Sequence, residues 1–228
     1  VHGIRIEKTL LSEIFGVGFS AMLMQVMTLL QQTILYRVAH NYGGDDWQII
    51  LGAALSIQSF TLIPIWGMSQ GLQPAVGTNF GAKQYARVKQ ITKFFAFGAT
   101  VLCMIFYIPI QLAPQTVLSW FIKEPGIVNQ GVSNFRILFS TYILLGFMLM
   151  VITMMQAMGK ASKASILVML RQIVLFIPLV IFLPKIGGLG VDGVFVGPPL
   201  TDLIVIVLTA IMLVSEFRNM TQLTVQGK

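Results

Sequence analysis

The 228-residue chain is 56% hydrophobic and only 10% charged, with a formal net charge of +7 and a mean hydropathy of +0.83. Soluble domains carry about 25% charged residues, so this composition excludes an ordinary soluble protein. The basic residues lie in short segments between long apolar runs, which is typical of membrane topology and argues against nucleic acid as a partner. The single cysteine, Cys103, cannot form an internal disulfide, and no cysteine or histidine spacing indicates a metal site.

Six long apolar runs occupy nearly the whole chain. A bilayer core about 30 Å thick needs roughly 20 residues of helix, and each run meets that length. We therefore predict an all-α integral membrane protein, a single bundle of six transmembrane helices with no extramembrane domain. The predicted spans are residues 10–36, 49–80, 93–113, 132–158, 164–183 and 193–214.

The first two predicted spans contain polar side chains at depth. Gln25, Thr28 and Gln32 recur at helical spacing and so share one face of the first span, and Gln58 is a further amide in the second. Such groups are costly to expose to lipid, so we expect them to face a cavity or another helix. Two interpretations remain open: a polar stripe that lines a substrate cavity, or hydrogen bonds between helices.

The second span is longer than a straight crossing requires and contains Pro64, Gly67, Gly71 and Pro74. Proline removes a backbone donor and kinks a helix, so we predict a bend. The kink is either static or a hinge for alternating access, because interrupted helices are common in transporters.

The last two spans carry opposite charges within the apolar run. Arg171 lies in the fifth span and Asp202 in the sixth, at depths that differ by less than ~10 Å at about 1.5 Å per residue. Consecutive antiparallel helices are usually neighbours, so we predict an Arg171–Asp202 ion pair that faces the interior. The pair serves either to neutralise two buried charges or as a switch in which Asp202 binds a proton or cation and releases Arg171.

Basic residues are concentrated in every second segment between the spans. These segments hold Arg5 and Lys8; Lys83, Arg87, Lys89 and Lys93; Lys160 and Lys163; and Arg218 and Lys228. The positive-inside rule then places both termini in the cytoplasm. Because the sequence begins at Val1 without a methionine, we also expect the natural product to begin upstream.

The sequence contains no nucleophile–base pair, HExxH motif, Walker loop or paired carboxylates. An enzyme active site in a membrane would need some such group of residues. We therefore predict a protein that is not an enzyme and that uses no cofactor.

Three stretches together resemble the multidrug and toxic compound extrusion (MATE) transporters. GLQPAVGTNFGAKQYARVKQ, residues 71–90, is similar to the end of the second helix in each lobe of that family. MQAMGKASKASILVMLRQIVLFIPLVIFLP, residues 155–184, and GLGVDGVFVGPPLTDLIVIVL, residues 188–208, resemble parts of the C-terminal lobe. The Arg171–Gln172 and Pro178 positions look most like the branch of Gram-positive multidrug exporters.

The resemblance implies twelve helices in two six-helix lobes, with a cavity between the lobes and exchange of organic cations or drugs for protons or sodium. This chain looks like the second lobe. Its partners would then be the lipid bilayer of a bacterial cell membrane, small organic cations or drugs, and a missing N-terminal lobe or a second copy of the chain. Some branches carry acidic cation ligands in the first and fourth helices of this lobe. Here the interior of the first span has Gln25 and no carboxylate, and the fourth has no acid.

Our prediction is therefore the C-terminal lobe of a multidrug or organic-cation antiporter that works by alternating access. Two alternatives remain. A lipid or polysaccharide flippase of a related fold predicts a strongly cationic cavity. A six-helix membrane subunit that binds a small molecule predicts tight binding by the chain alone.

Overall fold

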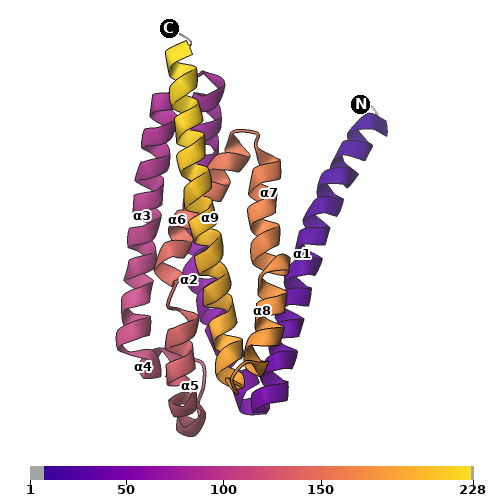
Figure 1. Cartoon of the computed structure of the whole chain (residues 1–228), viewed down its shortest axis with the longest axis vertical. Coiled ribbons are helices and arrows are strands. Elements are labelled where there is room, and N and C mark those ends of the chain that lie inside the picture. The colour runs from indigo at the N-terminus through magenta and orange to yellow at the C-terminus, as the bar shows by residue number, and fades with distance from the viewer. Residues whose placement is uncertain (1–7, 227–228) are drawn as a thin grey trace, which may run out of the picture.

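The protein is a bundle of long helices joined by short connections (Figure 1). The structure is a computed structural model that describes residues 8–226, with side chains described at position 22 and over 25–223. These residues form helices and no strand, as predicted. The elements in chain order are α1 (Lys8–Gly43), α2 (Asp45–Gly81), α3 (Tyr85–Leu112), α4 (Pro114–Ser119), α5 (Pro125–Leu138), α6 (Tyr142–Ala157), α7 (Ala161–Met169), the π-helix η1 (Leu170–Val174), α8 (Phe176–Phe182), the 3-10 helix η2 (Leu183–Lys185) and α9 (Val191–Gln226).

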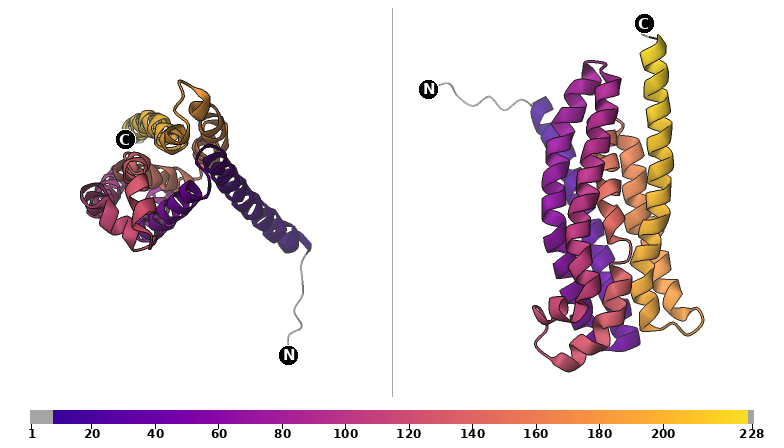
Figure 2. Two further views of the ribbon diagram at one scale, coloured as in Figure 1. Left: turned by 90° about the horizontal axis from the view of Figure 1, so that it is seen from below. Right: turned by 90° about the vertical axis from the view of Figure 1, so that its left-hand side faces the viewer.

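The long helices run alternately in opposite directions, so that α1 starts and α9 finishes at the same end of the bundle (Figure 1). Helix α3 packs against α2 and α6, and α9 packs against α5, α6 and α8. Helix α1 contacts α2, α8 and α9 but leans away from the other helices toward its N-terminal end (Figure 2). The bundle is therefore compact around α2, α3, α6 and α9 and more open beside α1.

Among the residues that the structure describes, four helical stretches are each long and apolar enough to cross a membrane: Asp45–Gly81, Tyr85–Leu112, Ala161–Lys185 and Val191–Leu223. They correspond to four of the predicted spans. The span predicted at 132–158 is instead a pair of helices, α5 and α6, bent by 42°, which together qualify as one further crossing. The first predicted span, 10–36, lies within α1, and most of its residues before 25 have side chains outside the described part of the chain.

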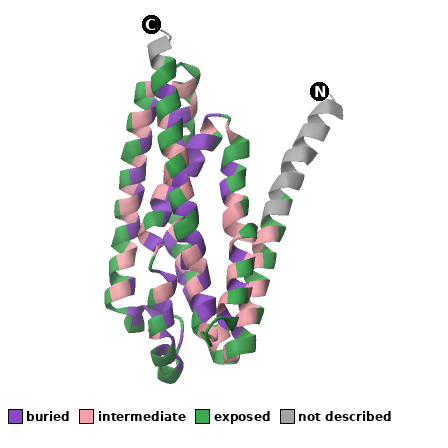
Figure 3. Ribbon diagram, viewed as in Figure 1, coloured by how far each residue is buried: buried purple, intermediate pink, exposed green. Residues whose placement is uncertain are grey.

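Small residues let the central helices approach closely. A Cβ atom added to Gly146 of α6 would lie 2.6 Å from the backbone oxygen of Ala99 and 2.9 Å from Cys103 Sγ on α3. The buried hydroxyls of Ser69 on α2 and Thr153 on α6 lie 2.7 Å apart. Tight backbone contact and interhelical hydrogen bonds are what hold helices together in lipid, where the solvent is as apolar as the core. The buried residues accordingly lie on the inward faces of the bundle (Figure 3).

The contact at Gly146 generates a stability prediction. Gly146→Ala places a methyl group against backbone atoms of α3 that cannot move aside alone, so we expect it to destabilise the protein by about 1–3 kcal/mol. Thermal unfolding in detergent measures the effect. Gly67→Ala in α2 is the matched control, because nothing lies within 4 Å of its Cβ position. Equal melting temperatures for the two variants would contradict close packing of α3 on α6.

Candidate functional site

A polar pocket of about 180 Å³ lies between α1, α2, α8 and α9, beside η1. Its lining combines amides, a hydroxyl and a charge pair with apolar side chains: Thr28, Gln31, Gln32, Leu35, Leu55, Gln58, Leu62, Leu138, Arg171, Gln172, Phe176, Pro198 and Asp202. The pocket thus gathers Thr28, Gln32 and Gln58, which the sequence proposed as cavity residues. Gln25 is exposed and does not line it.

The ion pair lies in the wall of this pocket. Arg171 Nε donates a hydrogen bond to Asp202 Oδ1 at 2.6 Å, and the two side chains are 31% and 9% exposed. The contact is the one predicted from the matched depths of the two charges. Removing one partner of such a pair leaves an uncompensated charge and costs about 3–5 kcal/mol, so each charge is needed as long as the other is present.

A local distortion of the helix presents Arg171 to α9. The segment Ala161–Lys185 is interrupted by η1, in which the N–H of Leu175 bonds to the carbonyl of Leu170 five residues back, at 2.9 Å. Pro178 follows one turn after this segment and has no N–H to continue the regular ladder. The extra residue of a π-turn rotates the helix, and such turns are frequent at functional sites. Arg171 lies within it.

Helix α9 is also irregular where it meets the pocket. Pro198 and Pro199 remove two successive backbone donors from the first third of the helix. Asp202 follows Pro198 by about one turn and therefore lies on the same side of the helix. The hydroxyl of Thr201 bonds to the carbonyl of Gly197 at 3.0 Å. The pocket is therefore built where two helices both depart from regular α-helical hydrogen bonding.

Sequence reasoning missed two polar residues of the pocket, Gln31 and Gln172, along with its apolar lining. Gln31 lies next to Gln32 but off the stripe defined by i, i+3 and i+7, and the strict helical period excluded it. Gln172 follows Arg171 directly, and a regular α-helix would turn neighbouring side chains about 100° apart. Here Arg171 and Gln172, both within η1, line the same pocket. The signal in the sequence that could have identified Gln172 is its position next to Arg171, a charge within a membrane span.

The proposed hinge residues lie in a continuous helix. Pro64, Gly67, Gly71 and Pro74 are all exposed and fall within α2, which is unbroken from Asp45 to Gly81. Membrane helices tolerate proline because neighbouring groups satisfy the freed carbonyls. The interruptions of helical structure lie instead at residues 139–141 and at η1. The hinge role of the α2 residues stays a prediction.

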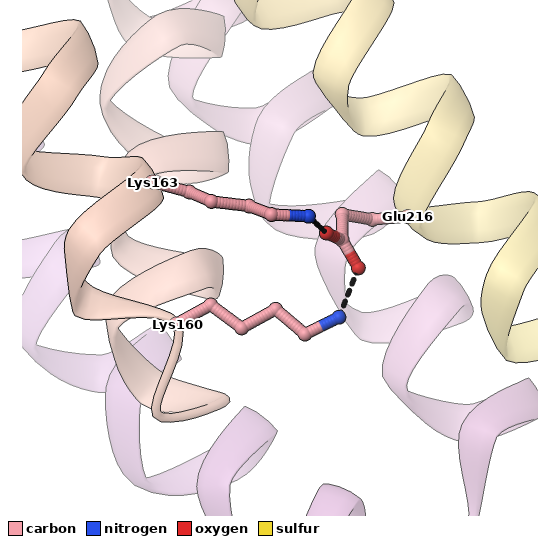
Figure 4. A network of polar contacts seen from close by, with 3 residues as sticks. All are labelled: Lys160, Lys163 and Glu216. Atoms are coloured by element: carbon pink, nitrogen blue, oxygen red, sulfur yellow. Dashed lines mark hydrogen bonds and ion pairs between the residues drawn. The ribbon is translucent and has the colours of Figure 1, made fainter.

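A second charge cluster lies on α9 at the end of the bundle that holds the α6–α7 turn. Glu216 of α9 points between Lys160 and Lys163 and accepts a hydrogen bond from each (Figure 4), with Lys163 Nζ 2.5 Å from Oε1. Its side chain is only 1% exposed. The end of helix α6 is followed by Gly159, which has a φ of 75°. The N–H of Lys160 donates a hydrogen bond to the carbonyl of Met155 at 2.9 Å. This turn of the chain places both lysines beside α9.

The polar pocket is too small for a drug-sized molecule, which occupies roughly 300–1,000 Å³. A larger cavity, of about 500 Å³, lies between α2, α3 and α4 and shares no residue with the pocket. It is lined almost entirely by apolar side chains, including Phe60, Phe106 and Trp120. Two of these rings are strongly exposed on the outside of the bundle, Phe60 at 67% and Trp120 at 75%. Of these two cavities, the polar pocket is the one that offers the mixed chemistry of a site for polar or charged substrates.

The MatE family model matches residues 20–182. The chain is 26% identical over 187 residues to "Multidrug export protein MepA" of Staphylococcus saprophyticus, which covers 82% of this chain and 41% of that protein. It is 26% identical over 153 residues to the "FAD transporter" of Shewanella oneidensis, covering 67% of this chain and 33% of that one. The chain thus spans well under half the length of these curated relatives.

Solved structures share the fold. The inward-facing conformation of a multidrug resistance MATE family transporter matches with a TM-score of 0.87 at 19% identity, over 96% of this chain and 50% of that chain. A MOP superfamily transporter from Pyrococcus furiosus matches with a TM-score of 0.83 at 20% identity, over 95% and 49%. The described helices therefore form one lobe of that fold, in a multi-pass protein of the bacterial cell membrane. The chain belongs to the MatE family, which is a family of transporters and not of enzymes.

Proposed function

We propose that this chain is the C-terminal six-helix lobe of a multidrug or organic-cation efflux antiporter driven by a proton or sodium gradient. The observation that carries the proposal is the polar pocket of about 180 Å³ built around an ion pair. It is a fraction of the volume that a drug needs, as expected of one wall of a larger cavity. The rest of the wall would come from an N-terminal lobe of the same polypeptide or from a second copy.

In the proposed mechanism Asp202 is the group that exchanges the coupling ion. With Asp202 charged, the pair holds η1 against α9. Binding of a proton or cation to the carboxylate weakens its attraction for Arg171, and the guanidinium turns toward the amides of the pocket. Because η1 lacks the regular helical ladder, this segment can rearrange at lower cost than α2 or α3. The rearrangement would be coupled to rocking of one lobe against the other.

The pocket chemistry favours this function over the two alternatives. A flippase for polyanionic lipids needs several unpaired cations, whereas the only cation among the described residues of the lining is Arg171, which is paired. A self-sufficient binding subunit needs an enclosed site of ligand size, and the polar pocket falls short of it.

Orientation follows from charge: we assign both ends of the chain to the cytoplasm.

Replacing Asp202 tests the coupling role. We expect Asp202→Asn to abolish gradient-driven efflux of a fluorescent cation from cells, since the amide cannot exchange a proton. Asp202→Glu should retain part of it. The double variant Arg171→Gln, Asp202→Asn removes both charges, so it should be more stable than Asp202→Asn alone and equally inactive. Full proton-coupled transport by Asp202→Asn, in protein of normal abundance, would exclude the switch.

The pocket lining makes a separate prediction about substrate. Gln32→Leu, Gln58→Leu and Gln172→Leu each remove an amide from the pocket and should weaken efflux to different degrees for different cations, because each amide contacts a substrate differently. Gln25→Leu is the matched control, as Gln25 lies outside the pocket on the same helix as Gln32. Dose–response measurements of drug resistance compare the variants. Unchanged resistance for all three pocket variants would rule out this cavity assignment.

Topology can be tested with introduced cysteines. Cys103 is fully buried, so it contributes little background labelling. We expect a membrane-impermeant maleimide to label Lys185→Cys in intact cells and to label Lys83→Cys only after the membrane is opened, because Lys83 lies at the end assigned to the cytoplasm. The reverse pattern would place both chain ends outside.

A further inference from the structure

The two ends of the bundle differ in charge. The end that holds the α2–α3 and α6–α7 connections and the last turns of α9, here called the basic end, carries one carboxylate among its described side chains. Its charged residues are Lys83, Arg87, Lys89, Lys93, Lys160, Lys163, Arg218 and Glu216. At the opposite end cations and carboxylates are balanced: Arg37, Lys123, Arg136 and Lys185 against Asp45, Asp46, Glu124 and Asp192.

The one carboxylate that the structure describes at the basic end already has two ion-pair partners. Glu216 is buried between Lys160 and Lys163 (Figure 4), which take both of its oxygens. Within the described part of the chain, neither Lys89 nor Lys93 forms an ion pair. Their charges are therefore not neutralised by any carboxylate that the structure describes.

Lys89 and Lys93 nevertheless converge on one point of α9. Their Nζ atoms lie 5.9 Å and 6.0 Å from the centroid of the Phe217 ring, and Lys89 also donates a hydrogen bond to the hydroxyl of Thr221. The two lysines are four residues apart on α3, where like charges repel each other. The ring offsets part of this repulsion. An anion between the two ammonium groups would offset the rest.

The surface next to these lysines along the span is apolar and exposed. On α3, Phe94 and Phe97 are 74% and 71% exposed, and Phe97 follows Lys93 by one helical turn. On α9, Ile211 and Val214 are 61% and 51% exposed and precede Phe217. A pair of cations at the end of a membrane helix, above bare apolar surface, matches an amphiphile with an anionic head and hydrocarbon tails.

We infer that the seam between α3 and α9 at the basic end binds an anionic phospholipid. Lys89 and Lys93 hold its phosphate, and an acyl chain lies along Phe94 and Phe97. Basic pockets between membrane helices recognise such headgroups, and each lysine near the surface contributes enough attraction for about a fivefold change in affinity. The bound lipid would link the start of α3 to the end of α9, independently of the transport cycle.

Native mass spectrometry of the purified full-length protein tests this inference. The probes are phosphatidylglycerol and phosphatidylcholine with identical acyl chains, at matched concentrations. We expect the wild-type protein to prefer phosphatidylglycerol, and the double variant Lys89→Gln, Lys93→Gln to lose that preference by about thirtyfold, the product of two lysines. Lys89→Arg with Lys93→Arg should keep it.

Lys185→Gln is the matched control. The ammonium of Lys185 also lies over an aromatic ring, 5.7 Å from the centroid of Phe182, but it is a single lysine at the opposite end. Its loss should leave the lipid preference unchanged. An unaltered preference in the Lys89, Lys93 double variant would overturn the inference. So would inorganic phosphate or glycerol phosphate raising the melting temperature of the wild type as much as the lipid does, because the site would then bind a free anion.

Discussion

The structure of the polar part of the lobe depends on the ion pair between Arg171 and Asp202. A charged side chain in a membrane span costs several kcal/mol unless it is paired or hydrated, and here the two charges satisfy each other at 2.6 Å. The pair provides a charged centre beside which the amides of the polar pocket lie. A polar pocket between helices needs a polar anchor, because lipid would otherwise favour closing it with apolar side chains.

Three carboxylates, spaced along α9, bind this helix to neighbouring segments. Asp192 accepts a hydrogen bond from Asn134 of α5 at 2.9 Å, Asp202 pairs with η1, and Glu216 takes two lysines of the α6–α7 turn. These contacts reach three separate segments of the chain. The middle one lies in the pocket wall, and the outer two lie near the bundle ends. A change at Asp202 can therefore alter the middle of the lobe while α9 stays attached at both ends.

Much of this architecture was predictable because the signals are local. Apolar runs at 49–80, 93–113, 164–183 and 193–214 coincide, to within one residue at their ends, with parts of helical stretches long enough to span a membrane. The Arg171–Asp202 contact followed from two charges at similar depth on consecutive helices. Of the polar stripe, Thr28 and Gln32 line the polar pocket and Gln25 does not.

What the sequence could not supply depends on tertiary structure. The break between α5 and α6 occurs at Phe139, Ser140 and Thr141, without the proline or glycine that signals a kink. The position of Glu216 between two lysines joins residues more than 50 positions apart, which no local pattern encodes. The prolines of α2, conversely, predicted a bend, and α2 is hydrogen-bonded as one continuous helix across both of them. Intramembrane sequences tolerate such residues, so their presence alone does not locate a break.

The π-turn also fixes the rotational phase of everything that follows it. The wider turn of η1 takes up one residue more than an α-helical turn does, and in a regular helix each residue adds about 100° of rotation. If Leu170–Val174 were regular α-helix with the same number of residues, Phe176 and Val180 of α8 would turn away from the core in which they now pack. Deleting one residue from this segment would remove the π-turn and keep the same face of α8 inward, so an alignment gap of one position here marks the loss of the π-turn and not a change of face.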